Sequence, residues 1–403
     1  MPSKASRIPW VLLILILVIA IAPALNDHKV PPVMSLLMKL FHMSAKQGGS
    51  LMSIFAFMAL VFGLPAGFIF QKMGYRLAGS IGLLATVAGS FLGALSASYG
   101  SLFFSRCLEA VGLAFLSVVL PAVIGQRMPK GKKGLAMGAY ALHMPLGTFF
   151  AFAIAPALVS RWGWQGLWWF GALYAAAMFI VFIVLVRPAP VETARQIGSG
   201  AQTQVRDRAA LRNPGLWMLV LMWVCFSILV QGIVTWLPAY LVRIQHYTLA
   251  QAAFVMSLRT FCILPSNLVG GYLTDRFGWR IVCVVPMFID AMAFPLSAFF
   301  TGLPLYGLMV IQGLVGGFIA PSATTGISEV AGPGQQGMGM GMMTVGRTVG
   351  NLIGPIALGT VIDSWGWIPA FILFCPVAVF GGLSALFIFK MKMGQPAAGT
   401  ITG

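Results

Sequence analysis

The sequence predicts an all-α integral membrane protein with twelve transmembrane helices arranged as two six-helix pseudo-repeats. Three observations support this prediction: the composition, a series of apolar runs of membrane-spanning length, and a duplication of the chain. Of the 403 residues, 59% are hydrophobic and only 8% are charged, and the mean hydropathy is +0.92. Soluble domains carry about 25% charged residues, so this composition excludes an ordinary soluble fold.

Apolar runs of about 20 residues recur along the whole chain, and each has the length that a helix needs to cross a bilayer. The basic start MPSKASR is also typical of a secretory signal, but eleven further runs favour a first membrane helix. The expected helices span residues 9–34, 47–70, 77–98, 101–125, 134–158, 164–187, 214–242, 249–273, 281–300, 303–327, 337–361 and 366–390.

The duplication is visible in two pairs of similar stretches. Residues 51–76 read LMSIFAFMALVFGLPAGFIFQKMGYR, and residues 255–280, which lie 204 positions later, read VMSLRTFCILPSNLVGGYLTDRFGWR. A second pair, SRWGW at 160–164 and DSWGW at 363–367, has an offset of 203. Two parallel repeats of six helices follow from this pattern.

One connection between the expected helices is long and polar. Residues 187–212 are rich in Arg, Gln, Gly and Pro, so we expect a flexible cytoplasmic linker there. We therefore divide the chain into an N-terminal six-helix bundle (1–187), the linker (188–212) and a C-terminal six-helix bundle (213–403).

The net charge of +17 encodes orientation, and its placement argues against nucleic-acid binding. Seventeen of the 25 Lys and Arg residues lie near the termini and in every second loop, whereas the loops between hold four. This bias places both termini in the cytoplasm. We expect a multi-pass protein of a plasma membrane of the bacterial inner-membrane type, acting as a monomer. The other four cations lie within spans and are Lys29, Arg106, Arg259 and Arg347.

The most specific motif follows the eighth expected span. Residues 271–280 read GYLTDRFGWR and match the loop motif G-x-L-x-D-R-x-G-x-R of the major facilitator superfamily, which the chain resembles over essentially its whole length. The copy after the second span, GFIFQKMGYR at 67–76, has Gln71 where the motif has Asp. The resemblance implies a secondary transporter that works by alternating access, with substrate held between its two halves.

The loop motif is expected to gate the protein on its cytoplasmic side. A carboxylate there can pair with arginines and cap a helix N-terminus. Gln71 can form hydrogen bonds but no ion pair, so Asp275 should make the stronger gate; the alternative is that these charges only set the topology. The residues expected to gate are Asp275, Arg276, Arg280, Gln71, Lys72 and Arg76.

Arg259 and Arg347 are the strongest candidates for a substrate site. Each lies near the middle of a span, where an arginine costs about 2.5–3.5 kcal/mol on insertion scales and is usually directed into a polar cavity. Their repeat counterparts, Phe55 and Met144, are apolar. Guanidinium groups offer paired donors to carboxylate or nitrate-like anions. Basic residues in spans eight and eleven also resemble the arrangement in oxalate/formate porters of the superfamily, and its nitrate/nitrite porters likewise have basic site residues.

Two further residues are candidates for the substrate site. Arg106 begins RCLEAVG at 106–112, which is similar to the superfamily's R-x-x-Q-G-x-G and implies a cavity or coupling residue; alternatively, Glu109 neutralises it at spacing i, i+3. His143 is a lone polar residue in the fifth span, where a packing role is the alternative. For the two central arginines the alternative is a structural salt bridge, for example to Glu109 or Asp290.

Asp27, His28 and Lys29 follow the first apolar run. If the first helix ends at Ala24, these residues form a solvated rim, but the run before Ala24 is short for a hydrocarbon core of about 30 Å. We therefore expect the helix to continue to about Met34 and to hold all three within the membrane. Asp and His together can bind and release a proton near physiological pH, so Asp27 and His28 are candidates for proton coupling.

These observations predict a secondary active transporter that moves a small organic or inorganic anion by proton symport or anion exchange. Multidrug or cation efflux is an alternative that the Arg106 motif suggests and the scarcity of central acids opposes. A non-transporting membrane sensor on the same fold is a second alternative, but it would not need mid-span arginines. The expected partners are the anionic substrate, the bilayer, and protons or a counter-anion.

No catalytic chemistry is visible in the sequence. We find no nucleophile–base pair, metal-ligand cluster or nucleotide-binding loop, and the five cysteines show no CxxC pairing. We therefore expect no enzymatic activity, no cofactor and no metal.

Overall fold

The computed structural model describes residues 10–129, 132–186, 208–332 and 335–390, and all regular structure within these ranges is helical. The N-terminal helices are α1 (Trp10–His28), α2 (Val30–Leu40), α3 (Ala45–Ala94), α4 (Tyr99–Arg127), α5 (Lys133–Ala141), α6 (His143–Trp162) and α7 (Gln165–Leu185). The C-terminal elements are the 3-10 turn η2 (Arg208–Arg212), α9 (Pro214–Arg243), α10 (Leu249–Phe277), α11 (Trp279–Phe299), α12 (Gly302–Val330), α13 (Gln336–Trp365), α14 (Trp367–Leu373) and α15 (Cys375–Lys390).

Twelve crossings can be assigned to these helices. Eleven of the described helical segments are long and apolar enough to span a membrane. One of them, α3, has 50 residues and is interrupted at Gly74, whose φ of 78° and ψ of 170° are not helical. A 50-residue helix is about 75 Å long, more than twice the thickness of a hydrocarbon core. Since α3 supplies two crossings, the prediction of an all-α membrane protein with twelve transmembrane helices is confirmed.

The duplication is present in the backbone as well as in the sequence. Helix α3 begins with a capping box formed by Ser44 and Gln47, and α10 begins with the same device formed by Thr248 and Gln251. Positive φ values recur at matching positions, namely His42 (49°) and His246 (59°), Gly74 (78°) and Gly278 (82°), and Gly163 (67°) and Gly366 (85°). Because equivalent turns are built alike, a residue in one half can be compared directly with its counterpart in the other.

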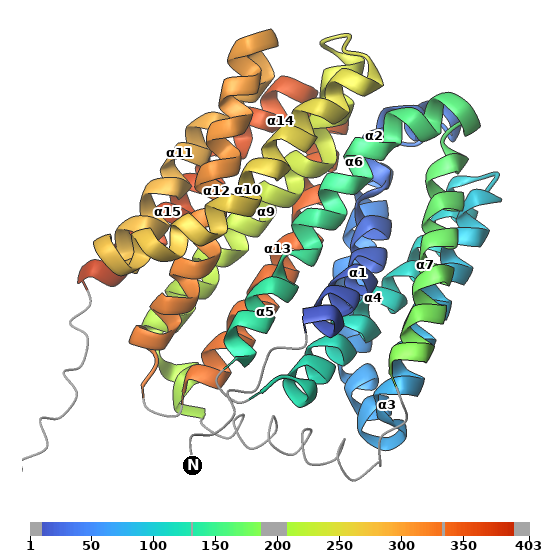
Figure 1. The fold of residues 1–403 in the computed structure, drawn as a ribbon. Helices are drawn as coiled ribbons and strands as arrows, with labels where there is room; N and C mark the ends of the chain where they lie inside the picture. The colour runs from blue at the N-terminus through green and yellow to red at the C-terminus, as the bar shows by residue number, and fades with distance from the viewer. Residues whose placement is uncertain (1–9, 130–131, 187–207, 333–334, 391–403) are drawn as a thin grey trace, which may run out of the picture.

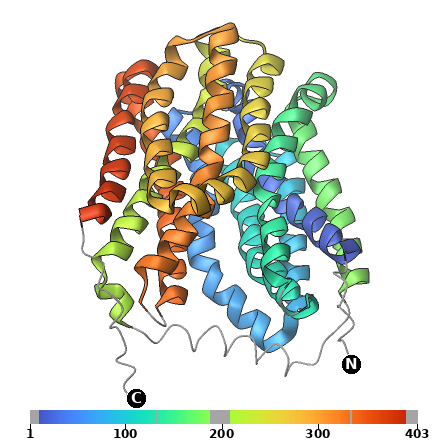
Figure 2. The ribbon, with the colours of Figure 1, turned by 60° about the vertical axis from the view of Figure 1, so that its left-hand side comes forward.

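The helices form two groups in space. Figures 1 and 2 show α1–α7, coloured blue to green, beside α9–α15, coloured yellow to red. We call these the N-terminal group and the C-terminal group. The groups touch mainly at three pairs of helices, α3 with α13, α6 with α10, and α2 with α9, and α2 also contacts α10. A functional side chain can therefore lie inside one group or between the two.

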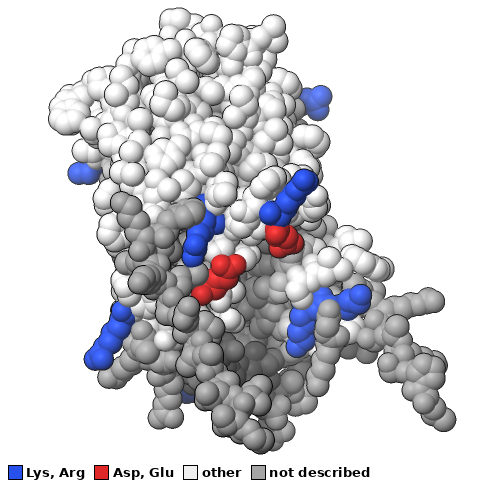
Figure 3. All heavy atoms as spheres, turned by 90° about the vertical axis from the view of Figure 1, so that its left-hand side faces the viewer, with Lys and Arg blue, Asp and Glu red and all other residues white. Residues whose placement is uncertain are grey.

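The surface is suited to lipid. Figure 3 shows one face of the molecule, whose upper half carries very few Lys, Arg, Asp or Glu side chains. Leu64 of α3 and its repeat counterpart Leu268 of α10 are 84% and 80% exposed. Soluble monomers rarely expose large contiguous apolar patches, whereas acyl chains solvate such surfaces without cost. The exposed leucines thus mark the same lipid-facing position in each half.

Candidate functional site

The N-terminal group encloses a charged cluster centred on Glu109. Lys29 lies between α1 and α2 and is fully buried. Its Nζ is 2.5 Å from Glu109 Oε1, 2.7 Å from Asn26 Oδ1 and 2.5 Å from Ser90 Oγ. An ammonium group has three N–H donors, and all three are used here. The Trp168 ring, with its centroid 4.7 Å from Nζ, covers the remaining side.

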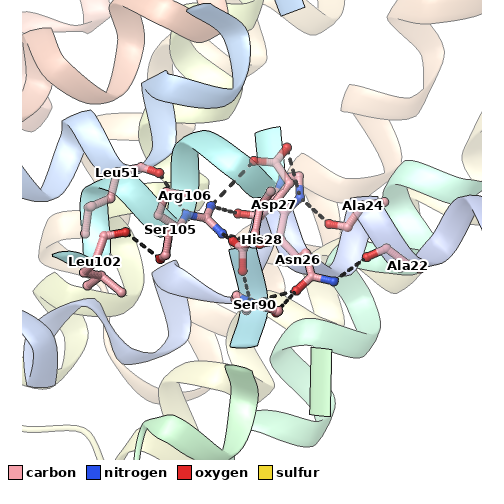
Figure 4. Close-up of polar contacts among 12 residues, drawn as sticks. Ala22, Ala24, Asn26, Asp27, His28, Leu51, Ser90, Leu102, Ser105 and Arg106 are labelled. Carbon is pink, nitrogen blue, oxygen red and sulfur yellow. Dashed lines mark hydrogen bonds and ion pairs between the residues drawn. The ribbon is translucent and has the colours of Figure 1, made fainter. Parts of the chain in front are cut away.

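Arg106 shares the same carboxylate. Its Nη1 is 2.7 Å from Glu109 Oε2, so Glu109 bridges two cations at once. As Figure 4 shows, the guanidinium also points at the α1 backbone and at α3. It donates to the carbonyl oxygens of Asn26, Asp27 and Leu51. Arg106 has no exposed surface, and neutralisation by Glu109, the alternative recognised from the i, i+3 spacing, is the arrangement found.

Asp27 and His28 lie inside the bundle and not at a solvated rim. Helix α1 continues to His28, and each of the two residues is only 6% exposed. The Asp27 carboxylate lies 3.7 Å from His28 Nδ1 and 4.0 Å from Arg106 Nη2. Its Oδ1 has no hydrogen-bond partner among the described residues. Asp27 is therefore a second acid beside Arg106 that is held more loosely than Glu109.

Arg259 belongs to a separate pair in the C-terminal group. Its side chain, on α10, is 3% exposed, and its buried Nε has no hydrogen-bond partner in the described part of the chain. Asp290 of α11, 6% exposed, is the acid that interacts with it electrostatically. The repeat counterpart of Glu109 in the C-terminal group is Gln312, which carries no charge to pair with Arg259. Of the two acids that the sequence suggested for Arg259, Glu109 is engaged elsewhere and Asp290 is the neighbour.

Arg347 differs from the other three mid-span cations. It lies in the middle of α13, its side chain is exposed, and within the described ranges it makes no hydrogen bond or ion pair. Its electrostatic partners are Tyr140 and His143, which stand at the junction of α5 and α6 in the N-terminal group. Arg347 thus interacts electrostatically with residues of the opposite group, while Arg106 and Arg259 each have an acid inside their own group.

The Tyr140–His143 pair has a fixed geometry. The two rings stack with centroids 4.4 Å apart and planes inclined by 28°. His143 Nδ1 lies 2.7 Å from the Tyr140 carbonyl oxygen, and because a carbonyl only accepts, this contact assigns the proton of the neutral imidazole to Nδ1. The other ring nitrogen, Nε2, is left available to a ligand.

Among the residues expected to gate, Asp275 is the carboxylate of the loop motif. Asp275 is exposed and has no ion pair within 4.0 Å among the residues placed in the structure. Arg276 lies over Phe277, with 5.4 Å from the guanidinium carbon to the ring centroid. The other contacts of this set are Lys72 over Phe68 at 4.4 Å, Arg76 Nη2 to the Ile183 carbonyl at 3.4 Å, and Arg280 over Trp279 at 5.5 Å. Gln71, at the position of Asp275 in the first repeat, is half-buried.

An internally duplicated bundle of twelve membrane crossings, with charges enclosed at mid-span, defines a helical membrane protein of the secondary-transporter class. The chain belongs to the Major Facilitator Superfamily: the model of that family matches residues 12–289 and 245–400. Family and fold both point to a transporter.

Proteins with similar sequences include transporters of several different names. Human sialin is 20% identical over 376 residues, covering 86% of this chain and 76% of sialin. A putative metabolite transport protein of Haemophilus influenzae is 23% identical over 378 residues, covering 88% of this chain and 89% of that protein. The match to the multidrug transporter AQR1 of Candida glabrata is 30% identical over 121 residues, which is 30% of this chain and 20% of that protein.

Solved structures show the same fold. The nucleoside transporter NupG, as its D323A mutant, has a TM-score of 0.80 at 14% identity, covering 94% of this chain and 100% of that chain. A bacterial homolog of the human lysosomal transporter Spinster, inward-facing and unoccupied, has a TM-score of 0.78 at 16% identity, covering 94% and 96%.

Replacing Glu109 by Gln should destabilise the protein strongly. The change leaves Lys29 and Arg106 buried without their shared counter-charge, and breaking a buried ion pair costs about 3–5 kcal/mol. Adding Lys29→Met to Glu109→Gln removes one stranded cation and should recover part of the loss. Melting temperature and detergent-extracted yield of the single and double variants measure this. A double variant no more stable than Glu109→Gln alone would show that the two charges do not depend on each other.

Replacing Arg259 by Phe installs the residue found at the repeat position, Phe55, so the helix should accept its shape. Asp290 then loses its electrostatic partner, and we expect a lower melting temperature. Asp290→Asn in the Arg259→Phe background should restore most of the loss, because a neutral amide needs no counter-charge. If Arg259→Phe melts like the unaltered protein, Asp290 does not depend on Arg259.

Proposed function

We propose that this protein is a secondary active transporter of a small organic or inorganic anion, and that Arg347 is the residue that binds it. The supporting observation is a difference in charge compensation. Lys29 and Arg106 share Glu109, and Arg259 has Asp290 nearby. Arg347 is the mid-span cation for which the described chain provides no acid.

A substrate anion can supply the missing counter-charge. A guanidinium group presents paired N–H donors that match a carboxylate or a planar inorganic anion, and such charge-assisted bonds are strong where water is scarce. The proposal of a site between the two helix groups is supported by the exposure of Arg347 and by its electrostatic interaction with Tyr140 and His143 of the N-terminal group. A site between the halves is reached from alternate sides as the halves move.

His143 and Tyr140 complete the proposed site from the N-terminal group. His143 Nδ1 donates to the Tyr140 carbonyl, so in the neutral ring Nε2 accepts from a hydroxyl or N–H group of the substrate, and it donates to the anionic group itself only when the ring is protonated. A cationic substrate would meet the Arg347 guanidinium at the same place, which disfavours cation efflux. We assign the direct contact with the substrate to Arg347 and not to Arg259 or Arg106, because the latter two face acids within their own groups.

Replacing Arg347 by Met, the residue at the repeat position, should abolish anion binding without harming the fold. Charge-assisted hydrogen bonds contribute about 1.5–3 kcal/mol each, so affinity should fall roughly 100-fold or more. Arg347→Lys should be intermediate, because it keeps the charge but loses the planar fork. Thermal stabilisation by a panel of small anions, and their uptake into proteoliposomes, are the measurements.

Arg161→Met is the matched control, because Arg161 is an exposed arginine at the end of α6. It removes the same charge outside the proposed site and should leave uptake unchanged. Normal anion uptake by Arg347→Met would refute the anion site. An equal loss in both variants would mean that net charge, and not a binding contact, is responsible.

We further propose that Asp27 and His28 couple transport to a proton. Their side chains are adjacent, buried and next to Arg106, so a proton gained or lost there changes the charge balance of the cluster. Asp27→Asn or His28→Ala should abolish gradient-driven accumulation yet keep exchange of substrate for substrate, because exchange moves no net proton. Accumulation that survives both changes would remove these residues from coupling.

A further inference from the structure

The two helix groups are joined most closely where α3 begins and α13 ends. A Cβ atom added at Gly49 of α3 would come within 2.3 Å of the Pro355 carbonyl oxygen, and one added at Gly359 of α13 would come within 2.5 Å of the Ala45 carbonyl oxygen. Trp236 of α9 donates its indole N–H to the Pro355 carbonyl at 2.9 Å. The two helices therefore meet backbone to backbone, with no room for side chains between them.

A single carboxylate crosses this junction. Asp363, near the end of α13, accepts hydrogen bonds from the backbone N–H groups of Ala45 at 2.7 Å and Lys46 at 2.8 Å. The first N–H groups of a helix have no acceptor within the helix, and the positive end of its dipole favours an anion. Ser44 caps Gln47 from within α3, so Asp363 satisfies donors that the capping box leaves open. One helix group thus caps a helix of the other.

The duplication provides a matched interface that lacks this contact. This matched interface joins α6 of the first repeat to α10 of the second. Helix α10 begins with the same capping box as α3, but Ser160 of α6 takes the position of Asp363. The Ser160 hydroxyl donates to the Ala157 carbonyl of its own helix at 3.1 Å. Between α6 and α10 lies an apolar cavity of about 510 Å³, lined by residues such as Phe149, Pro156 and Phe254. The two equivalent interfaces therefore differ in both packing and charge.

We propose that Asp363 is a releasable latch that holds the two helix groups together at the end of the molecule opposite the last turn of α7 and the first turn of α9. For this end to open, the carboxylate must leave the N-terminus of α3. The α3–α13 interface then controls opening, and the α6–α10 interface follows. On the opposite side Asp275 has no ion pair among the described residues, which agrees with a conformation held closed through Asp363 in an alternating-access cycle.

Distances between spin labels at Ala97 and Thr301 test the latch. Both residues are exposed and stand in loops at this end, one in each group. The full-length protein in nanodiscs, with no anion added, should give mainly a short distance. Asp363→Ser installs the residue found at the matching position of the first repeat, Ser160, and should raise the ratio of long to short distances about tenfold or more, since two charge-assisted hydrogen bonds are lost. Asp363→Asn, which keeps the shape without the charge, should fall between.

Two other variants keep the test decisive. Ala45→Pro removes one N–H donor from the α3 side, at a helix position that tolerates proline and after Ser44, whose backbone is already extended. It should produce the same shift even if Asp363→Ser fails to fold, and the double variant should add little. Ser160→Ala is the control and should change nothing.

An unchanged distance ratio in Asp363→Ser, or in Ala45→Pro where Asp363→Ser does not fold, overturns the proposal. So does an equal shift in Ser160→Ala, which would show that the two interfaces are equivalent. Because the measurement uses no substrate, its failure is distinguishable from failure of the anion site at Arg347.

Discussion

The structure depends on the compensation of charge inside an apolar bundle. Hydrocarbon offers no hydrogen bonds, so a mid-span cation must find an acid, a carbonyl or an aromatic face within the protein. Glu109 meets this need for two cations at once, and carbonyl oxygens of α1 and α3 take the remaining donors of Arg106. The cluster ties α1, α3 and α4 together inside the N-terminal group.

In the C-terminal group the charge of the buried cation, Arg259, is compensated by fewer partners. Phe55, the repeat counterpart of Arg259, packs against Arg106, with 4.2 Å between the guanidinium carbon and the ring centroid. In the second repeat Arg259 occupies the position that Phe55 has in the first, and Asp290 of the neighbouring helix α11 supplies the counter-charge. One ancestral packing position has thus been used in two ways, and the charge inside each half is balanced locally. Among the described mid-span cations, Arg347 is the one without an acid beside it, which is the basis of the proposed anion site.

The sequence was sufficient for the architecture because its signals are local. The length of the apolar runs predicted the membrane-spanning helices. The repeated stretches that contain Gly74 and Gly278 indicated equivalent turns, and both glycines have positive φ. The i, i+3 spacing of Arg106 and Glu109 also allowed their ion pair to be anticipated. Lys29 and Asp363 were missed as partners because their contacts join residues 80 and more than 300 positions apart. No periodicity encodes such pairs, since they exist only after the helices have packed.

The position of Lys29 has a consequence for how the protein is made. Lys29 is synthesised in the first membrane segment, whereas its counter-ion Glu109 and the Ser90 hydroxyl arrive in later ones. Until α4 has been inserted, α1 carries an ammonium group that the bilayer does not solvate. We therefore expect the first segment to stay beside the insertion machinery, or in another hydrated shelter, until about 80 further residues have been translated and Glu109 can pair with Lys29. In that order of events α1 is assembled late, together with α4.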